Sequence, residues 1–294
     1  MNRVRVCVPG TSANLGPGFD CFGMAWALYQ ELEFAPSDRL EITGCPTAYQ
    51  NENNLAYQAF CRTLEFAGIL PPKGLRISFL RSEIPISRGL GSSASLICGG
   101  IAGADAMYGL GLTGDQKLSL AAGMEGHPDN AAPALFGGFT ACAMLECGPA
   151  LTVYAVSERL HFAALIPDFE LSTRLARAAL PEQVPLRDAV FNVSRAALLP
   201  KAMETGDLPL LKQVLADRLH QPYRFPLIPG SARAIALAQG QGAAVCISGA
   251  GPTLLCIGES EALSGMLREA LAAELSGWRV IELLPDRTGT VQQL

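Results

Sequence analysis

The stretch from Ser92 to Tyr108 constrains the fold more than any other part of this sequence. Its residues are small or apolar on almost every side, as expected of a helix packed against several neighbours. The segment Gly89-Leu90-Gly91-Ser92-Ser93 leads directly into it. Glycines let a backbone approach closely, and the start of a helix offers unpaired N–H groups at the positive end of its dipole. The pattern predicts either a phosphate-binding loop or a plain tight turn with an N-cap, and spacing alone leaves both open.

Shorter patterns flank that stretch on both sides. Strands are predicted at 4–8, 75–79, 139–145, 151–156, 162–166, 243–248 and 253–257. Helices are predicted at 54–67, 171–180, 187–204, 207–219 and 260–275. Pro9-Gly10 is expected to end the first strand, with a loop rich in Gly, Ser and Asn behind it. This mixture predicts an α+β fold of two domains, 1–158 and 159–294.

Composition and charge exclude several classes of function. With a net charge of -5, a pI near 5.3 and no cluster of Lys and Arg, the chain lacks the basic surface that nucleic-acid binding needs. Its nine cysteines are odd in number and include no Cys-x-x-Cys pair, so we expect them to be reduced and mostly buried. Neither a secretory leader nor a bilayer-spanning stretch is recognised. We expect a cytoplasmic enzyme with neither nucleic-acid nor membrane partners.

The common nucleotide-binding signatures are missing from the sequence. It contains no Gly-x-x-x-x-Gly-Lys-[Ser/Thr] loop and no strand-borne Gly-x-Gly-x-x-Gly. The His-Arg-Asp and Asp-Phe-Gly elements of protein kinases are absent as well. If the chain binds ATP, another architecture must hold it.

Three segments in a fixed order resemble the motifs of the GHMP kinases, the superfamily that includes galactokinase, homoserine kinase and mevalonate kinase. They are Pro9–Asp20, Pro85–Ala94 and Ser248–Thr253, and together they span nearly the whole chain. The resemblance implies ATP as phosphate donor and Mg²⁺ as metal. It also implies an N-terminal nucleotide-binding domain and a C-terminal ferredoxin-like α/β sandwich. The ATP contacts that it implies are Pro85, Arg88, Gly89, Leu90, Gly91, Ser92, Ser93, Asn54, Gly249 and Gly251. Asn54 is equally well explained as an N-cap.

Within that superfamily, further segments are similar to the homoserine kinases. These segments are 125–134, 172–181 and 217–224. The resemblance implies ATP-dependent phosphorylation of the L-homoserine hydroxyl, a step of threonine biosynthesis. Two alternatives stay open: another small-molecule kinase of this superfamily, acting on mevalonate or an isoprenoid precursor, and a noncatalytic metabolite sensor. Relatives are often dimers, so the assembly stays open between a monomer and a homodimer.

Homoserine carries an ammonium, a carboxylate and a hydroxyl, and the sequence offers a partner for each. The substrate-binding residues that the resemblance implies are Asn14, Asp20, Asn130, Thr173, Arg177 and Arg224. A guanidinium fork matches the two oxygens of a carboxylate, so both arginines are assigned to it. Asp20 is assigned to the ammonium, although Asn14 and Asp20 would also suit a glycine-rich turn. Thr173 either helps to hold the carboxylate or faces solvent.

The same resemblance implies a metal site and a group of catalytic residues. Mg²⁺ prefers hard oxygen ligands, and Ser93 with Glu125 is the expected pair, with Asp129 as the fallback because the connection after Glu125 is very short. Phosphoryl transfer depends mainly on alignment and charge neutralisation. Asn130 is expected to align the acceptor hydroxyl, while either Asp129 or His127 is expected to accept its proton.

Overall fold

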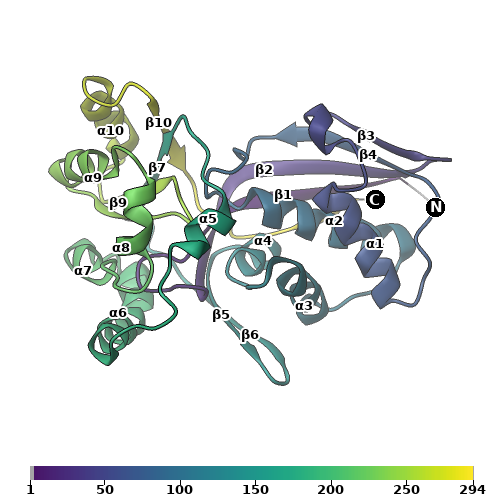
Figure 1. Cartoon of the computed structure of the whole chain (residues 1–294), viewed down its shortest axis with the longest axis horizontal. Helices are drawn as coiled ribbons and strands as arrows, with labels where there is room; N and C mark the ends of the chain where they lie inside the picture. Colours follow the sequence, from purple (N-terminus) through teal and green to yellow (C-terminus); the bar gives the residue numbers. More distant parts are fainter. Residues whose placement is uncertain (1–2, 294) are drawn as a thin grey trace.

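The computed structural model describes residues 3–293, and over that range the chain forms two β-sheets with helices packed on each (Figure 1). The first sheet contains seven strands of the described chain: β1 (Val4–Ala13), β2 (Phe22–Pro36), β3 (Leu40–Thr43), β4 (Leu75–Ser82), β5 (Phe139–Leu145), β6 (Gly148–Tyr154) and β11 (Val291–Gln293). Five of them run in the order β11-β1-β2-β4-β3, and β5 pairs with β2 and carries β6. Only the pairing of β3 with β4 is parallel.

The second sheet is smaller and antiparallel throughout. Its strands are β7 (His161–Pro167), β8 (Ala244–Ile247), β9 (Leu254–Gly258) and β10 (Trp278–Leu283), in the order β10-β7-β9-β8. With helices on this sheet and on the first, the α+β class predicted from the sequence is confirmed.

Two groups of helices cover the sheets. The helices α1 (Leu55–Phe66), α2 (Ser92–Tyr108), α3 (Gly114–Glu125) and α4 (Ala131–Phe136) lie beside the first sheet (Figure 1). The helices α6 (Leu186–Thr205), α7 (Leu208–Val214), α8 (Gln221–Arg224), α9 (Ser231–Gly240) and α10 (Leu263–Ala272) surround the second. Short 3₁₀ turns occupy Thr47–Tyr49 and Phe225–Leu227. The helix α5 (Thr173–Ala178) lies between these two groups of helices.

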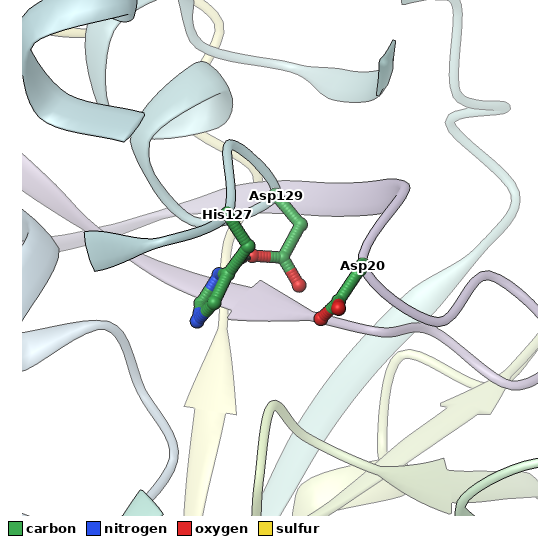
Figure 2. Close-up of side chains that lie close together, drawn as sticks. All are labelled: Asp20, His127 and Asp129. Atoms are coloured by element: carbon green, nitrogen blue, oxygen red, sulfur yellow. Dashed lines mark hydrogen bonds and ion pairs between the residues drawn. The ribbon is translucent and has the colours of Figure 1, made fainter. Parts of the chain in front are cut away.

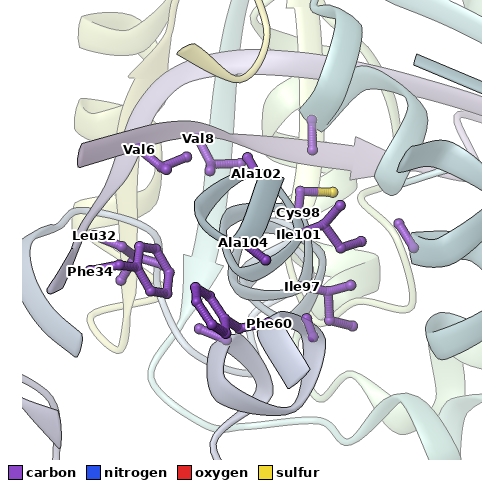
Figure 3. Close-up of a cluster of buried hydrophobic side chains, with 14 of the residues drawn as sticks. Val6, Val8, Leu32, Phe34, Phe60, Ile97, Cys98, Ile101, Ala102 and Ala104 are labelled. Atoms are coloured by element: carbon purple, nitrogen blue, oxygen red, sulfur yellow. The ribbon is translucent and has the colours of Figure 1, made fainter. Parts of the chain in front are cut away.

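The apolar helix α2 is the centre of the core under the first sheet. Most of its residues are buried, and Figure 3 shows its side chains facing those of β1, β2 and α1. Small residues let its neighbours approach closely: a Cβ added at Gly100 would lie 2.2 Å from the carbonyl oxygen of Ala56 in α1. The prediction of a helix packed on several sides is therefore confirmed.

The first strand is longer than predicted, because Pro9-Gly10 does not end it. The pairing of β1 with β2 shifts register between Pro9 and Gly10 and then continues to Ala13. Such a bulge accommodates a residue that cannot donate to the ladder. Beyond it every residue of the strand is buried, so no polar–apolar alternation marks it in the sequence.

The two sheets with their helices share part of one core, and the chain passes between them twice. The start of β2 packs with β7 and with α6 and α7 through one continuous cluster of buried side chains that includes Trp26, Phe162 and Leu199. The chain leaves the first sheet after β6 and returns to it at the end, where β11 pairs with β1. A domain boundary at residue 158 remains a prediction.

The nine cysteines are unpaired in the described structure, and Cys147 alone among them is exposed. Within residues 3–293, no helix has both the length and the apolar character needed to cross a bilayer.

Candidate active site

The glycine segment before α2 forms a tight loop against two other parts of the chain. Gly89 and Gly91 have φ angles of +73° and +71°, which favour glycine. A Cβ at Gly91 would lie 2.0 Å from the hydroxyl of Thr11, and a Cβ at Gly89 would lie 2.4 Å from the carbonyl oxygen of Ser248. The loop therefore exists in this form only because glycine stands at both positions, and it places Ser92 and Ser93 at the first turn of α2.

A chain of hydrogen bonds joins the three sequence motifs. The indole N–H of Trp26 donates to Ser12 Oγ at 2.8 Å, and Ser248 Oγ donates to the carbonyl oxygen of Gly89 at 2.6 Å. The two serine hydroxyls lie 2.6 Å apart, and since the Ser248 proton is already used, Ser12 must donate between them. The segments 9–20, 85–94 and 248–253 thus meet at one site, although Ser12 and Ser248 are 236 residues apart.

A cavity of about 540 Å³ opens at this meeting point. Among the residues singled out in the sequence, those that line it are Asn14, Asn54, Arg88, Gly89, Gly91, Ser92, Ser93, Glu125, His127, Asn130, Thr173, Arg177, Arg224, Gly249 and Gly251. Four others do not line it. The side chain of Leu90 is packed in the core and Pro85 is half-buried, while Asp20 is hydrogen-bonded to the lining residue Arg177 and Asp129 to the lining residue His127.

Glu125 ends α3 beside the start of α2. Ser93 Oγ donates to Glu125 Oε1, and Glu125 Oε2 is buried with no hydrogen-bond partner in the described structure. Burial raises the pKa of Glu125 to about 7, against the lowering effect of the Ser93 hydrogen bond. A buried carboxylate oxygen without a partner, next to a serine hydroxyl, is a donor set that suits Mg²⁺.

Asp20, His127 and Asp129 converge from two loops (Figure 2), with one ligand atom from each lying within 4.8 Å of the others. The His127 Nδ1–H donates to Asp129 Oδ1. Burial lowers the pKa of His127, but the hydrogen bond and charge of Asp129 outweigh it and raise that pKa overall. Asp129 Oδ2 is fully buried and has no partner in the described structure. The cluster therefore offers an acceptor that the protein itself leaves unused.

Polar loop residues hold this cluster in place. Asn14 and Asp20 both have positive φ angles, and Asn14 Oδ1 accepts a hydrogen bond of 2.9 Å from the backbone N–H of Asp20. The Thr11 hydroxyl donates to Asn130 Oδ1 at 2.9 Å, which fixes the Asn130 amide at the cavity wall. The turn-stabilising and substrate-binding interpretations of Asn14 are thus compatible, because it does the first while lining the cavity.

Two arginines line the same end of the cavity in different electrostatic states. Arg177 forms two parallel hydrogen bonds with the Asp20 carboxylate, of 2.8 and 3.0 Å, and this pairing raises its pKa. Arg224 is almost wholly buried, and burial together with the charge of Arg177 lowers its pKa to about 10. Both guanidinium carbons lie over the ring of Phe19, at 5.4 Å and 5.3 Å from its centroid. The arrangement can hold an anion and a cation side by side.

Arg88 links the glycine loop before α2 to the segment before α5. Its Nη2 donates to the carbonyl oxygen of Asp168 at 2.8 Å, while its buried Nη1 has no hydrogen-bond partner and lies 3.5 Å from Glu170 Oε1. The backbone N–H of Leu171 also donates to the carbonyl oxygen of Ser87, at 3.4 Å. A half-satisfied guanidinium at the cavity wall is chemically suited to a phosphate oxygen.

Asn54 caps α1 and also lines the cavity. Its Oδ1 accepts from the backbone N–H groups of Ala56 and Tyr57, and its Nδ2 donates to the carbonyl oxygen of Tyr49. The N-cap interpretation is therefore correct, and a contact with a bound base would use the same side chain.

Two residues of this site received no role from the sequence. Phe19 and His220 stand inside the motif segments but are neither charged partners of homoserine nor phosphate ligands. The structure stacks their rings 5.4 Å apart, next to both arginines. Only their place inside the motifs pointed to these two residues, because no local pattern predicts contacts across about 200 residues of chain.

The chain is similar to known proteins over nearly its whole length. Residues 54–138 match the GHMP kinases N terminal domain, and residues 199–277 match the GHMP kinases C terminal region. Homoserine kinase of Clostridium botulinum (strain Kyoto / Type A2) is 42% identical over 98% of both chains. Homoserine kinase of Moorella thermoacetica is 42% identical over 97% of this chain and 98% of the relative. The crystal structure of homoserine kinase from Cytophaga hutchinsonii superimposes with a TM-score of 0.86 at 26% identity, over 100% of this chain and 98% of that one.

Proposed function

The chain belongs to the homoserine kinases of the GHMP kinase family, and we propose that its cavity transfers the γ-phosphate of ATP to the hydroxyl of L-homoserine. One observation carries the proposal at the level of the site. A single cavity of about 540 Å³ joins the glycine loop at the start of α2 to Arg177 and Arg224, and Arg177 is hydrogen-bonded to Asp20. Phosphate donor and zwitterionic acceptor can therefore meet within one cavity.

The reaction needs alignment more than covalent help from the protein. The homoserine hydroxyl oxygen forms a bond to the γ-phosphorus while the bond from that phosphorus to the β–γ bridging oxygen breaks, and ADP leaves. We assign the phosphates to the backbone N–H groups of Gly89–Ser93 and to Arg88. The released hydroxyl proton is assigned to the pair formed by His127 and Asp129, with Asn130 orienting the hydroxyl.

Ser93 and Glu125 are the residues proposed to hold Mg²⁺, and their chemistry fits it because Glu125 Oε2 is buried without a partner. When bound, the ion would neutralise charge on the phosphate oxygens. Ser93 lies at the first turn of α2 and Glu125 at the last residue of α3, so the packing of two helices sets the spacing of the ligands.

The remaining assignments follow from position in the cavity. Asp20 is proposed to bind the ammonium, the two arginines the carboxylate, and Asn14 and Thr173 the polar groups between them. The part of the cavity that Asn54 lines is proposed to take the base of ATP. Gly249 and Gly251 are proposed to contact the phosphates of ATP. The assembly stays open between a monomer and a homodimer, which light scattering would resolve. A cytoplasmic location stays a prediction, which cell fractionation would check.

An acceptor screen tests the activity. The purified protein with Mg²⁺-ATP is given L-homoserine or mevalonate in a coupled assay of ADP release, and phosphorus NMR identifies the product. We expect ADP release with homoserine and an O-phosphohomoserine resonance. Turnover with mevalonate alone would move the chain to a different acceptor class, and ADP release stimulated by neither would favour a noncatalytic sensor.

A further inference from the structure

Arg224 is a buried cation that lacks a carboxylate partner in the described structure. Its Nη1 donates to His220 Nδ1 at 3.2 Å and to the carbonyl oxygen of Gly249 at 3.1 Å, and its Nε reaches the carbonyl oxygen of Ala176 at 3.5 Å. Its Nη2 forms no hydrogen bond with residues 3–293. Burying a charge among neutral acceptors is costly unless an anion completes the site. The side chain is thus prepared for an anionic ligand from the cavity that it lines.

The contact with His220 depends on which ring nitrogen carries the proton. His220 is fully buried, and its Nε2 lies 2.8 Å from the carbonyl oxygen of Gly16. A carbonyl oxygen only accepts, so Nε2 carries the proton and the neutral ring has a bare lone pair on Nδ1. That lone pair receives the Arg224 Nη1–H. The ring is therefore a bridge from the backbone of the N-terminal motif to the buried guanidinium.

The position of the His220 ring is fixed from several sides. The Asp217 carboxylate accepts from the backbone N–H groups of Leu219, His220 and Gln221, and also from Asn192 Nδ2. This network holds the turn that begins α8, which carries Arg224. On the other side, the ring of Phe19 stacks on the imidazole at 26°. Neither the backbone nor the ring of His220 can shift without breaking several contacts.

We propose that His220 is a positioning residue for the acceptor. It holds Nη1 of Arg224 so that Nη2 faces the substrate carboxylate. The stacked ring of Phe19 keeps the His220 imidazole in place. The inference rests on the acceptor site proposed above. It assigns to His220 a role in substrate affinity that involves no contact with the substrate and no proton transfer. It also explains why a neutral imidazole, and not a carboxylate, stands beside Arg224. A carboxylate there would satisfy the guanidinium before homoserine arrived.

Two substitutions test the roles of the two ring nitrogens of His220 separately. In His220→Asn, the amide oxygen comes near the place of Nδ1 and can still accept from Arg224. In His220→Gln, the amide nitrogen comes near the place of Nε2 and can still donate to the carbonyl oxygen of Gly16. We expect the Gln variant to raise the KM for homoserine by about tenfold, the effect of losing one hydrogen bond to a charged group. The Asn variant should rescue most of this loss. The KM for ATP should stay within about twofold in both, because the phosphate loop is untouched.

A double substitution tests whether the effect passes through Arg224. If it does, adding His220→Gln to Arg224→Met should leave kcat/KM for homoserine unchanged from that of Arg224→Met alone. Multiplicative losses, or equal effects of the Asn and Gln variants on both substrates, would overturn the positioning role. If the Gln variant does not fold, Phe19→Leu removes the stacked ring at a half-buried site and should raise the KM for homoserine and not that for ATP. An unchanged homoserine KM there counts against the proposal. A wild-type protein that does not phosphorylate homoserine would instead overturn the proposed function.

Discussion

Asp20 and Arg177 neutralise each other, and this pairing bears on how a zwitterion would bind. The two side chains are about one-third and two-fifths exposed, so solvent weakens their mutual attraction. A ligand that brings both an ammonium and a carboxylate can replace each partner with an equivalent charge. A ligand with only one charge leaves the other residue unpaired. We therefore expect the pair to favour amino acids over acids that lack an ammonium group, such as mevalonate.

Replacing Arg177 with Met tests the carboxylate assignment. The substitution keeps most of the apolar stem over Phe19 and removes the charge. We expect the KM for homoserine to rise about 10- to 100-fold, with a smaller change in kcat, because a charge-assisted contact is lost in both ground and transition states. Steady-state kinetics with each substrate varied in turn measure this. A selective rise in the KM for ATP would place Arg177 on the donor instead.

Glu125→Gln and Ser93→Ala test the proposed metal site. Gln keeps the size of the side chain but removes the negative charge, so the stabilisation of transition-state charge should suffer more than substrate binding. We expect kcat to fall on the order of 100-fold for the Gln variant and less for Ser93→Ala. Titrating Mg²⁺ at saturating ATP and homoserine provides the measurement, and both variants should need more Mg²⁺. Wild-type kcat in both would exclude these ligands.

Among the elements, α2 depends most closely on small residues. It packs against α1, β1 and β2 at once, and Ala56 of α1 leaves no space for a side chain at Gly100. Its first turn is also part of the glycine loop proposed to bind phosphate, so its placement in the core and the geometry of the site are set together.

Gly100→Ala tests this dependence, with Gly123→Ala as its matched control. The added methyl group at Gly100 would overpack the contact with α1, and we expect a loss of about 1–3 kcal/mol in the free energy of unfolding. Gly123 lies on the exposed side of α3 with nothing within 4 Å of an added Cβ, so Ala there should stabilise by about 0.5–1 kcal/mol. Urea unfolding measures both. Equal effects of the two substitutions would mean that the close approach does not matter.

Elements with a local pattern could be predicted, and those without one could not. The helix 92–108 is marked by a run of mostly small and apolar residues and the strand near 75 by alternation, and both lie where expected. The strand β2 was missed because much of it is buried on both faces, which removes the alternation, and α3, α9 and β10 also went unrecognised. In the site, the motifs identified the loop and the charged residues. The hydrogen bonds of Ser12, Ser248 and His220 could not be foreseen, because each joins segments far apart in sequence.

At the scale of the whole molecule, the buried His220 makes stability depend on pH. Burial, together with the charge of Arg224, lowers its pKa in the folded state against the opposing effect of Asp217. Between that lowered pKa and the unfolded value near 6.5, the unfolded chain binds more protons than the folded one. The contribution of His220 is therefore complete above about pH 6.5 and declines as the pH falls, by at most about 1.4 kcal/mol per pH unit for one proton.

Comparing wild type with His220→Asn isolates this contribution. The urea midpoint of the wild-type protein should fall more steeply from pH 7.5 to 5.5 than that of the Asn variant, because Asn takes up no proton. His127, whose raised pKa acts in the opposite direction, is present in both proteins and cancels. Parallel pH profiles would show that His220 is protonated in the folded state or that its ring is not buried.

The pairing of β11 with β1 also sets an order in time. The last strand of the chain completes the sheet that begins with the first one. During synthesis, the N-terminal half emerges long before its final edge partner has been made. Until the ribosome releases residues 291–293, the β1 edge stays unpaired, a state in which strands can join those of other chains. Chaperone contact with the nascent chain should therefore persist until residues 291–293 have emerged.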